Sequence, residues 1–91
     1  MQRTDAERLR VSRIAIVDDL DVYRVLDHLV QNSIIVPEDH ELICSKPTSK
    51  DRARLLLDIL PTRGPKAFSV FVQALRDAKY DWLADKLESN Q

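Results

Sequence analysis

The chain contains a single glycine, and this glycine stands directly before a proline, at Gly64-Pro65. Glycine accepts the left-handed conformation that ends many helices, and proline loses nothing at the first position of a helix. The pair therefore predicts that one helix ends here and the next begins. Apolar residues recur at helical spacing on both sides of it, namely Ala53, Leu56, Leu57 and Leu60 before the pair and Ala67, Phe68, Phe71, Ala74 and Leu75 after it.

The composition is typical of one small all-α domain. One glycine and four prolines in 91 residues leave little room for hairpin turns, and the β-branched runs are short. The 44% hydrophobic content is too high for a charged disordered tail, and the length suits one core rather than two. The longest wholly apolar run has only four residues, so neither a transmembrane span nor a signal peptide is predicted.

The charged residues nearly cancel, because 14 basic and 15 acidic side chains give a net charge of −1. Nucleic-acid-binding domains are usually basic overall, so this balance does not suggest one. It leaves room for separate patches of opposite sign, which steer protein partners. The single cysteine, Cys44, predicts neither a disulfide framework nor a cysteine-rich zinc site, and it favours a reducing, cytoplasmic location.

Capping signals divide the chain into six short helices. Thr4 and Glu7 form a capping box for a first helix over about residues 5–19. The other boundaries follow from similar signals: Asp21 caps the second helix and Asn32-Ser33 ends it, Pro37-Glu38-Asp39 opens the third, Thr48 with Asp51 caps the fourth, and the fifth and sixth span about residues 65–78 and 80–88.

Six short helices with short connections predict an antiparallel bundle. Leu42 and Ile43 are both expected to point inward from the third helix. Arg13 falls among apolar residues on a straight first helix, so either it lies at the edge with its stem buried or the helix bends there. The domain is expected to cover residues 1–88, with 89–91 as a tail or the start of a linker. The predicted core includes Leu20, Leu26, Leu29, Leu56, Leu60, Phe71 and Leu75.

The sequence offers no convincing catalytic, cofactor or metal site. His40 and Cys44 lie one turn apart on the predicted third helix, which brings their side chains close together. A Cys–His dyad also needs an oxyanion site and a cleft, so we expect Cys44 to be a small, buried or half-buried hydrophobe. His28 and His40 are expected at the surface and are too few for a metal centre. We therefore expect no enzyme activity and no cofactor in this domain.

The segment RGPKAFSVFVQAL, with the preceding DRARLLLDILPT, resembles the caspase recruitment domain (CARD) family, in particular the domains of initiator caspases and of a death-domain adaptor. The resemblance covers nearly the whole chain. It implies the Greek-key death fold, an all-α bundle whose first helix is commonly bent or broken. It also implies a homotypic protein interaction module that recruits or clusters an initiator caspase or its scaffold in apoptotic or inflammatory signalling. Such a domain can be the prodomain of a protease.

Basic residues concentrate in the first and fourth helices. From the residues alone two interpretations stay open, a solvated face balanced by carboxylates or a docking surface. The resemblance implies the second, because RLRVSRIAIVDDL is similar to the first helix of initiator-caspase domains, whose arginine at the position of Arg13 binds the partner. KDRARLLLDIL likewise resembles their fourth helix, although Lys50 lacks the planar fork of arginine. The predicted basic patch comprises Arg10, Arg13, Lys50, Arg52 and Arg54.

The opposite face is predicted to be acidic, because Asp27 lies off the apolar stripe of the second helix and three carboxylates crowd the third. LDHLVQNSIIVPED resembles the matching part of the apoptosome scaffold's recruitment domain, where the aspartate before histidine lies on the acidic binding side, and this implies a role for Asp27. Carboxylates at the start of the third helix also suit its dipole, and the two roles are compatible. The predicted acidic patch comprises Asp27, Glu38, Asp39 and Glu41.

A chain with both patches can bind a second copy head to tail. The expected partner is another CARD-containing protein, with self-assembly as a further option and with neither nucleic acid nor membrane involved. One alternative is a decoy of the same fold that blocks recruitment by occupying one face. Another is a helix-turn-helix nucleic-acid binder built from the fourth and fifth helices, although the fifth carries few basic residues. A death-effector or pyrin domain would share the bundle but not the RGPKAF segment.

Overall fold

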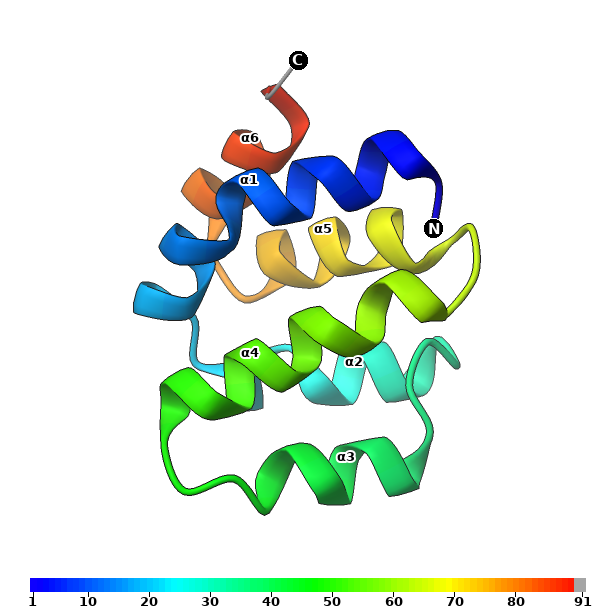
Figure 1. The fold of residues 1–91 in the computed structure, drawn as a ribbon, viewed down its shortest axis with the longest axis vertical. Helices are drawn as coiled ribbons and strands as arrows, with labels where there is room; N and C mark the ends of the chain where they lie inside the picture. The colour runs from blue at the N-terminus through cyan, green and yellow to red at the C-terminus, as the bar shows by residue number, and fades with distance from the viewer. Residues whose placement is uncertain (90–91) are drawn as a thin grey trace.

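Helices account for all the regular secondary structure of the computed structural model, which describes residues 1–89. Figure 1 shows α1, α3 and α5 running one way across the view and α2 and α4 the other way. The all-α antiparallel six-helix bundle predicted from the sequence is confirmed. In chain order the elements are α1 (Arg3–Asp19), the 3₁₀ turn η1 (Val22–Arg24), α2 (Leu26–Gln31), α3 (Pro37–Cys44), α4 (Ser49–Ile59), the 3₁₀ turn η2 (Leu60–Thr62), α5 (Ala67–Asp77) and α6 (Asp81–Ser89).

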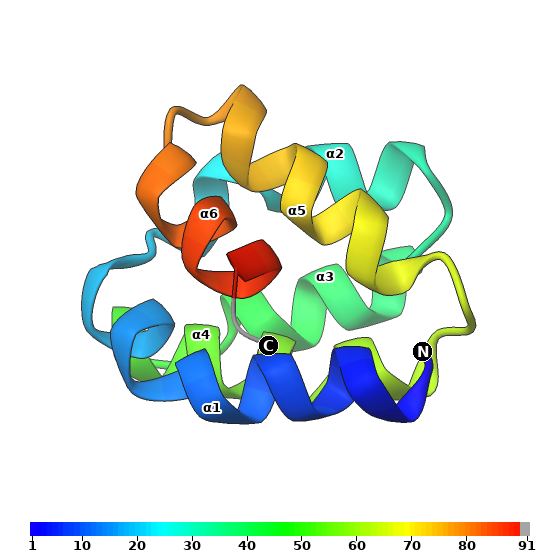
Figure 2. The same ribbon diagram turned by 90° about the horizontal axis from the view of Figure 1, so that it is seen from above.

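The helices pack around the core so that neighbouring pairs of them form separate surfaces. α4 packs against both α1 and α3, while α5 packs against α2 and α6, and α6 also contacts α1. Figure 2 shows α1 and α4 along one side of the molecule and α2 and α5 along the other. One exposed surface is therefore built by α1 and α4, and another by α2 and α3, which also contact each other.

The core follows the apolar periodicity closely. All seven residues predicted for it are buried, with at most 2% of each exposed, and Phe71 on α5 is completely enclosed. The inward orientation expected for Leu42 is wrong, because this side chain is 51% exposed while its neighbour Ile43 is fully buried. Consecutive residues lie about 100° apart around a helix, and α3 packs on the bundle with only one side.

Two predicted helix boundaries are confirmed at the atomic level. The Thr48 hydroxyl accepts a hydrogen bond from the Asp51 backbone N–H at 3.0 Å, which caps α4. Gly64 has φ +89, in the left-handed region that favours glycine. The capping box at Thr4 is wrong, since α1 already begins at Arg3. The Ala6 N–H donates to the Gln2 carbonyl at 2.9 Å and closes the first turn before Thr4 can cap it.

The second and fifth helices start later than the sequence predicts. The Asp21 carboxylate accepts from the Tyr23 N–H at 3.1 Å, but the segment it caps is η1, and α2 begins only at Leu26. Pro65 is not the first residue of α5. It lies in a turn that the Ala67 N–H closes by donating to the Gly64 carbonyl at 3.4 Å, so the helix begins at Ala67.

The C-terminal elements bear on two further expectations. α6 includes Ser89, the first residue of the predicted tail, and Asn90 and Gln91 lie outside the described residues. The exposed side of α5 carries Ser69, Gln73 and Asp77 and no cation among them, which does not suit the phosphate backbone of DNA. Six of its residues are buried: Ala67, Phe68, Phe71, Val72, Ala74 and Leu75.

Candidate functional site

Arg13 lies at the edge of α1, where the helix meets α4. Its Nη1 donates to Asp58 Oδ1 on α4 at 2.9 Å, and its Nη2 lies 3.4 Å from the Arg54 carbonyl. The side chain is 36% exposed. Of the two options for this residue, the edge position is therefore realised, and the guanidinium ties the two helices together while it remains accessible.

Three more cations surround Arg13, and each has a carboxylate of the same chain beside it. Arg10 donates to Glu7 one turn away, and this hydrogen bond lowers the pKa of the Glu7 carboxyl. The remaining contacts are Arg54 with Asp51 at 2.9 Å and Lys50 with Asp18 at 3.4 Å. We call Arg10, Arg13, Lys50 and Arg54 the basic face. Four carboxylates balance its four positive charges.

The basic face is hollowed between its cations. Arg13 and Asp58 line one shallow pocket with Arg10, and Arg13 lines a second with Arg54, Asp18 and Ile14. Ile14 is 78% exposed there, although it is a large aliphatic residue. The surface thus offers guanidinium groups, carboxylates and one apolar side chain within a small area.

Arg52 is separate from the other residues of the predicted basic patch. It stands on another flank of α4, where its Nη1 donates to the carbonyl of Lys46, in the loop between α3 and α4, at 2.9 Å. Its guanidinium carbon lies 4.9 Å from the centre of the Tyr23 ring, a cation–π distance. The structure therefore brings together four of the five predicted cations and places Arg52 elsewhere.

The predicted acidic patch also divides into two kinds of residue. Glu38 and Glu41 are exposed on α3, and the side chain of Asp27 on α2 is completely exposed. Asp39 is different, because its side chain is only 13% exposed. It accepts from the Val36 N–H at 3.0 Å and lies 2.6 Å from Arg63. We call Asp27, Glu38 and Glu41 the acidic face, and Asp39 supports the start of α3.

His40 and Cys44 lie close together, as their spacing predicts. The Cys44 Sγ is 3.7 Å from His40 Nδ1, and His40 Nε2 is 3.9 Å from Asp27 Oδ1. Cys44 is half-buried and packs against the core, which agrees with its expected role as a small hydrophobe. Within residues 1–89 no three His, Cys, Asp or Glu side chains are grouped so that they could hold a metal ion.

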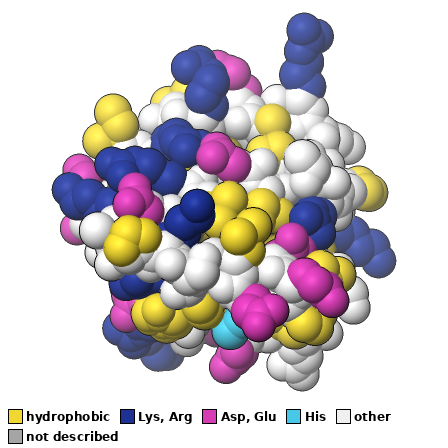
Figure 3. Space-filling model, turned by 60° about the horizontal axis from the view of Figure 1, so that its bottom comes forward, with side chains coloured by type: hydrophobic (Ala, Val, Ile, Leu, Met, Phe, Trp, Pro, Cys, Tyr) yellow, Lys and Arg dark blue, Asp and Glu magenta, His cyan; other side chains and the backbone are white. Residues whose placement is uncertain are grey.

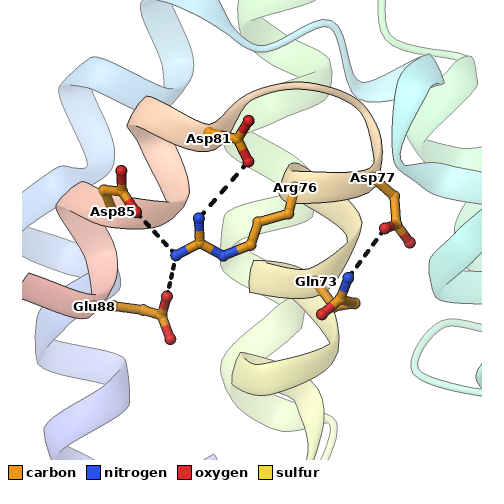
Figure 4. A network of polar contacts seen from close by, with 6 residues as sticks. All are labelled: Gln73, Arg76, Asp77, Asp81, Asp85 and Glu88. Atoms are coloured by element: carbon orange, nitrogen blue, oxygen red, sulfur yellow. Dashed lines mark hydrogen bonds and ion pairs between the residues drawn. The ribbon is translucent and has the colours of Figure 1, made fainter.

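A polar network that was not predicted from the sequence joins α5 to α6. Arg76 at the end of α5 contacts Asp81, Asp85 and Glu88 on α6, and Figure 4 shows the three carboxylates converging on its guanidinium. The hydrogen bonds to Glu88 and Asp85 raise the pKa of Arg76. The signal was present in the sequence, since acidic residues four and seven positions apart share one helix face.

None of the described helices combines the length and hydropathy that a membrane span requires. Two sequence comparisons relate the chain to known proteins. Residues 6–90 match the caspase recruitment domain family. The chain belongs to this family. The resemblance seen in the RGPKAF segment is confirmed, and the six-helix bundle is the death fold that it implied.

This CARD is similar to parts of much longer proteins. It is 34% identical over 87 residues to Caspase-2 of Gallus gallus, covering 96% of this chain and 20% of that protein. It is 32% identical over 93 residues to Caspase-9 of Homo sapiens, covering 100% of this chain and 22% of the relative. Identity to Apoptotic protease-activating factor 1 of Danio rerio is 27% over 90 residues, which is 99% of this chain and 7% of the relative. The chain thus spans less than a quarter of each.

Proposed function

We propose that this CARD is a homotypic protein interaction module that recruits or clusters an initiator caspase or its scaffold by contacting another CARD. The observation that carries the proposal is the pair of charged surfaces, a basic face on α1 and α4 and an acidic face on α2 and α3. Membership of the CARD family and similarity to caspases support it. The setting would be apoptotic or inflammatory signalling in the cytoplasm.

The basic face of one CARD would receive the acidic face of another. Surface ion pairs are individually weak, so an incoming carboxylate can replace one that the basic face already holds. Arg13 suits this exchange, because it reaches Asp58 from the edge of α1 and remains partly open to solvent. Glu38, Glu41 and the fully exposed Asp27 are the carboxylates available for such a contact.

Because one chain carries both faces, the contact is heterologous and leaves a free face at each end of the pair. Such contacts propagate into open assemblies unless their geometry closes. Clustering raises the local concentration of whatever is attached to the CARD, and so favours any contact between the attached domains. The domain would therefore act by proximity, for example as the prodomain of a protease.

A mixing experiment tests the proposal. Arg13→Glu places a negative charge in the basic face, and Asp27→Arg places a positive charge in the acidic face, so each variant should lose binding through one face. Each variant alone should stay monomeric in sedimentation velocity, whereas an equimolar mixture should form a dimer, because one intact face of each kind remains. High salt should weaken that dimer. Circular dichroism of both variants serves as the control for folding.

Two results of this experiment would contradict the proposal. If wild type self-associates, a mixture that stays monomeric while both variants are folded contradicts a contact between these two faces. If both variants also retain wild-type binding to a caspase-derived CARD in low salt, the charged faces are not the binding surfaces and the proposed function must use another part of the domain.

A further inference from the structure

The cations of the basic face can add little net affinity for a partner, because each already has a carboxylate beside it. The four cations are matched by Glu7, Asp18, Asp51 and Asp58. Figure 3, in which the bottom of the molecule comes forward, shows blue and magenta side chains interspersed on the left of the view. An incoming carboxylate would mostly exchange one partner for another, so the net electrostatic gain is small. Something besides charge must hold the partner.

Ile14 is the side chain best placed to do so. Among the described residues it is the most exposed large hydrophobic side chain, at 78%, and Val11 one turn before it is 53% exposed. Ile14 lines a shallow pocket together with Arg13 and Arg54, so it lies between the cations of the basic face. Burial of an aliphatic group at the centre of a charged contact supplies affinity that ion exchange does not.

The acidic face has a matching feature. Leu42 on α3 is 51% exposed, and it follows Glu38 by one helical turn, so the two side chains share a face. Val36, directly before α3, is 43% exposed. Figure 3 shows apolar side chains in yellow at the centre of the view, with carboxylates and a histidine gathered below and to the right. Each charged face thus presents exposed aliphatic side chains, of which Ile14 and Leu42 are the more exposed on their respective faces.

We propose that Ile14 is the affinity-determining residue of the basic face and that it docks against Leu42 of a second copy of this chain. The proposal rests on the proposed function, because it uses the same two faces. Charge complementarity selects this occupant, since Arg10 and Arg13 flank Ile14 while Glu38 and Glu41 flank Leu42. Charges would set orientation, and the aliphatic pair would set how long the contact lasts.

The other exposed large hydrophobic side chains of the described part provide controls. Tyr23 is covered on one side by the Arg52 guanidinium, so it already has a partner in its own chain. Trp82 is 51% exposed on α6, outside both charged faces. Trp82→Ala therefore removes a similar amount of exposed apolar surface without touching the proposed contact.

Sedimentation velocity over a series of protein concentrations measures the self-association of wild type, Ile14→Ala, Leu42→Ala and Trp82→Ala. Ile14→Ala and Leu42→Ala should each weaken self-association about tenfold, whereas Trp82→Ala should leave it unchanged. All melting temperatures should stay near that of wild type, because these side chains are exposed. The loss in Ile14→Ala should also be the same in low and high salt, unlike the loss in Arg13→Glu.

The double variant Ile14→Ala/Leu42→Ala shows whether the two residues touch each other. If they do, its loss is much smaller than the product of the two single losses. Fully multiplicative losses, or an Ile14→Ala variant that associates like wild type, overturn the proposal while the charge-reversal mixture continues to test the proposed function. Wild-type protein that stays monomeric overturns docking on a second copy. If wild type then binds a different CARD and Arg13→Glu does not, the proposed function holds even though the Ile14–Leu42 contact does not.

Discussion

The basic face and the acidic face differ in how their charges are partnered. Each cation of the basic face has a carboxylate of the same chain beside it, so its field largely cancels at a distance. The acidic face points Asp27, Glu38 and Glu41 into solvent and keeps its negative field. We infer that the acidic face steers a partner from afar and that the basic face acts only at contact, by exchanging partners.

Both faces depend on one core, so the largest expected effect removes them together. Phe71 on α5 is completely buried, and Phe71→Ala should lower the free energy of unfolding by about 3–5 kcal/mol. That is a large part of the stability of a small domain. Chemical denaturation followed by circular dichroism measures the loss. An unchanged unfolding midpoint would show that the core does not hold the two faces in place.

Within the predicted acidic patch, Asp39 should behave differently from Glu38. Asp39→Ala removes the hydrogen bond to the Val36 N–H and leaves Arg63 without its carboxylate, so it should destabilise the domain by about 1–2 kcal/mol. Glu38→Ala is the matched control on the same helix and should change stability by less than about 0.5 kcal/mol. Thermal unfolding of both variants measures the difference. Equal melting temperatures would mean that Asp39 does not stabilise α3 and belongs with the exposed carboxylates of the acidic face.

The sequence predicts the core and most helices because both depend on local spacing. The buried stripe of α5 and the Thr48 cap of α4 each involve residues at most one or two turns apart. Predictions fail where packing chooses between equivalent neighbours. Leu42 and Ile43 are both aliphatic, and only the position of α3 on the bundle determines that Ile43 is the buried one.

The candidate site is less predictable for the same reason. The pairing of Arg13 with Asp58 and of Lys50 with Asp18 joins helices far apart in the chain, so it is visible only once α1 packs beside α4. The separation of Arg52 from Arg54 could have been predicted, because residues two positions apart point to opposite sides of a helix. Helical geometry alone therefore argues against placing both in one patch.

The internal carboxylates of the basic face can be removed one at a time. Asp58→Asn keeps the shape of the side chain but releases Arg13, and it gives the face a net positive charge. If the cations are held back by their own partners, affinity for an acidic CARD face should rise about three- to tenfold, with a steeper salt dependence. Titration calorimetry at two salt concentrations measures this affinity. Asp85→Asn on α6 makes the same charge change outside both faces and should have no such effect. A weaker complex would mean that Asp58 orients Arg13 for binding.

The smallest effect concerns the outermost ion pair of the basic face, Glu7 with Arg10. The hydrogen bond from Arg10 lowers the pKa of Glu7 in the folded protein, so the folded state favours the ionised carboxyl. The stability from this pair is therefore present above the ordinary pKa of glutamate and is lost as the pH falls through the lowered value. The melting temperature of wild type should exceed that of Glu7→Gln slightly at pH 7, and the difference should disappear only in acid below the lowered pKa of Glu7.

The partner residue supplies the control for that measurement. Once Arg10→Gln has removed the cation, adding Glu7→Gln should cause no further pH-dependent change, because the interaction no longer exists. A difference between wild type and Glu7→Gln that is constant from neutral to acidic pH would mean that the two side chains do not pair in solution. Arg10 would then be unpaired, and the basic face would have a net positive charge. Only Arg13, Lys50 and Arg54 would still differ from the acidic face in having a carboxylate of the same chain beside them.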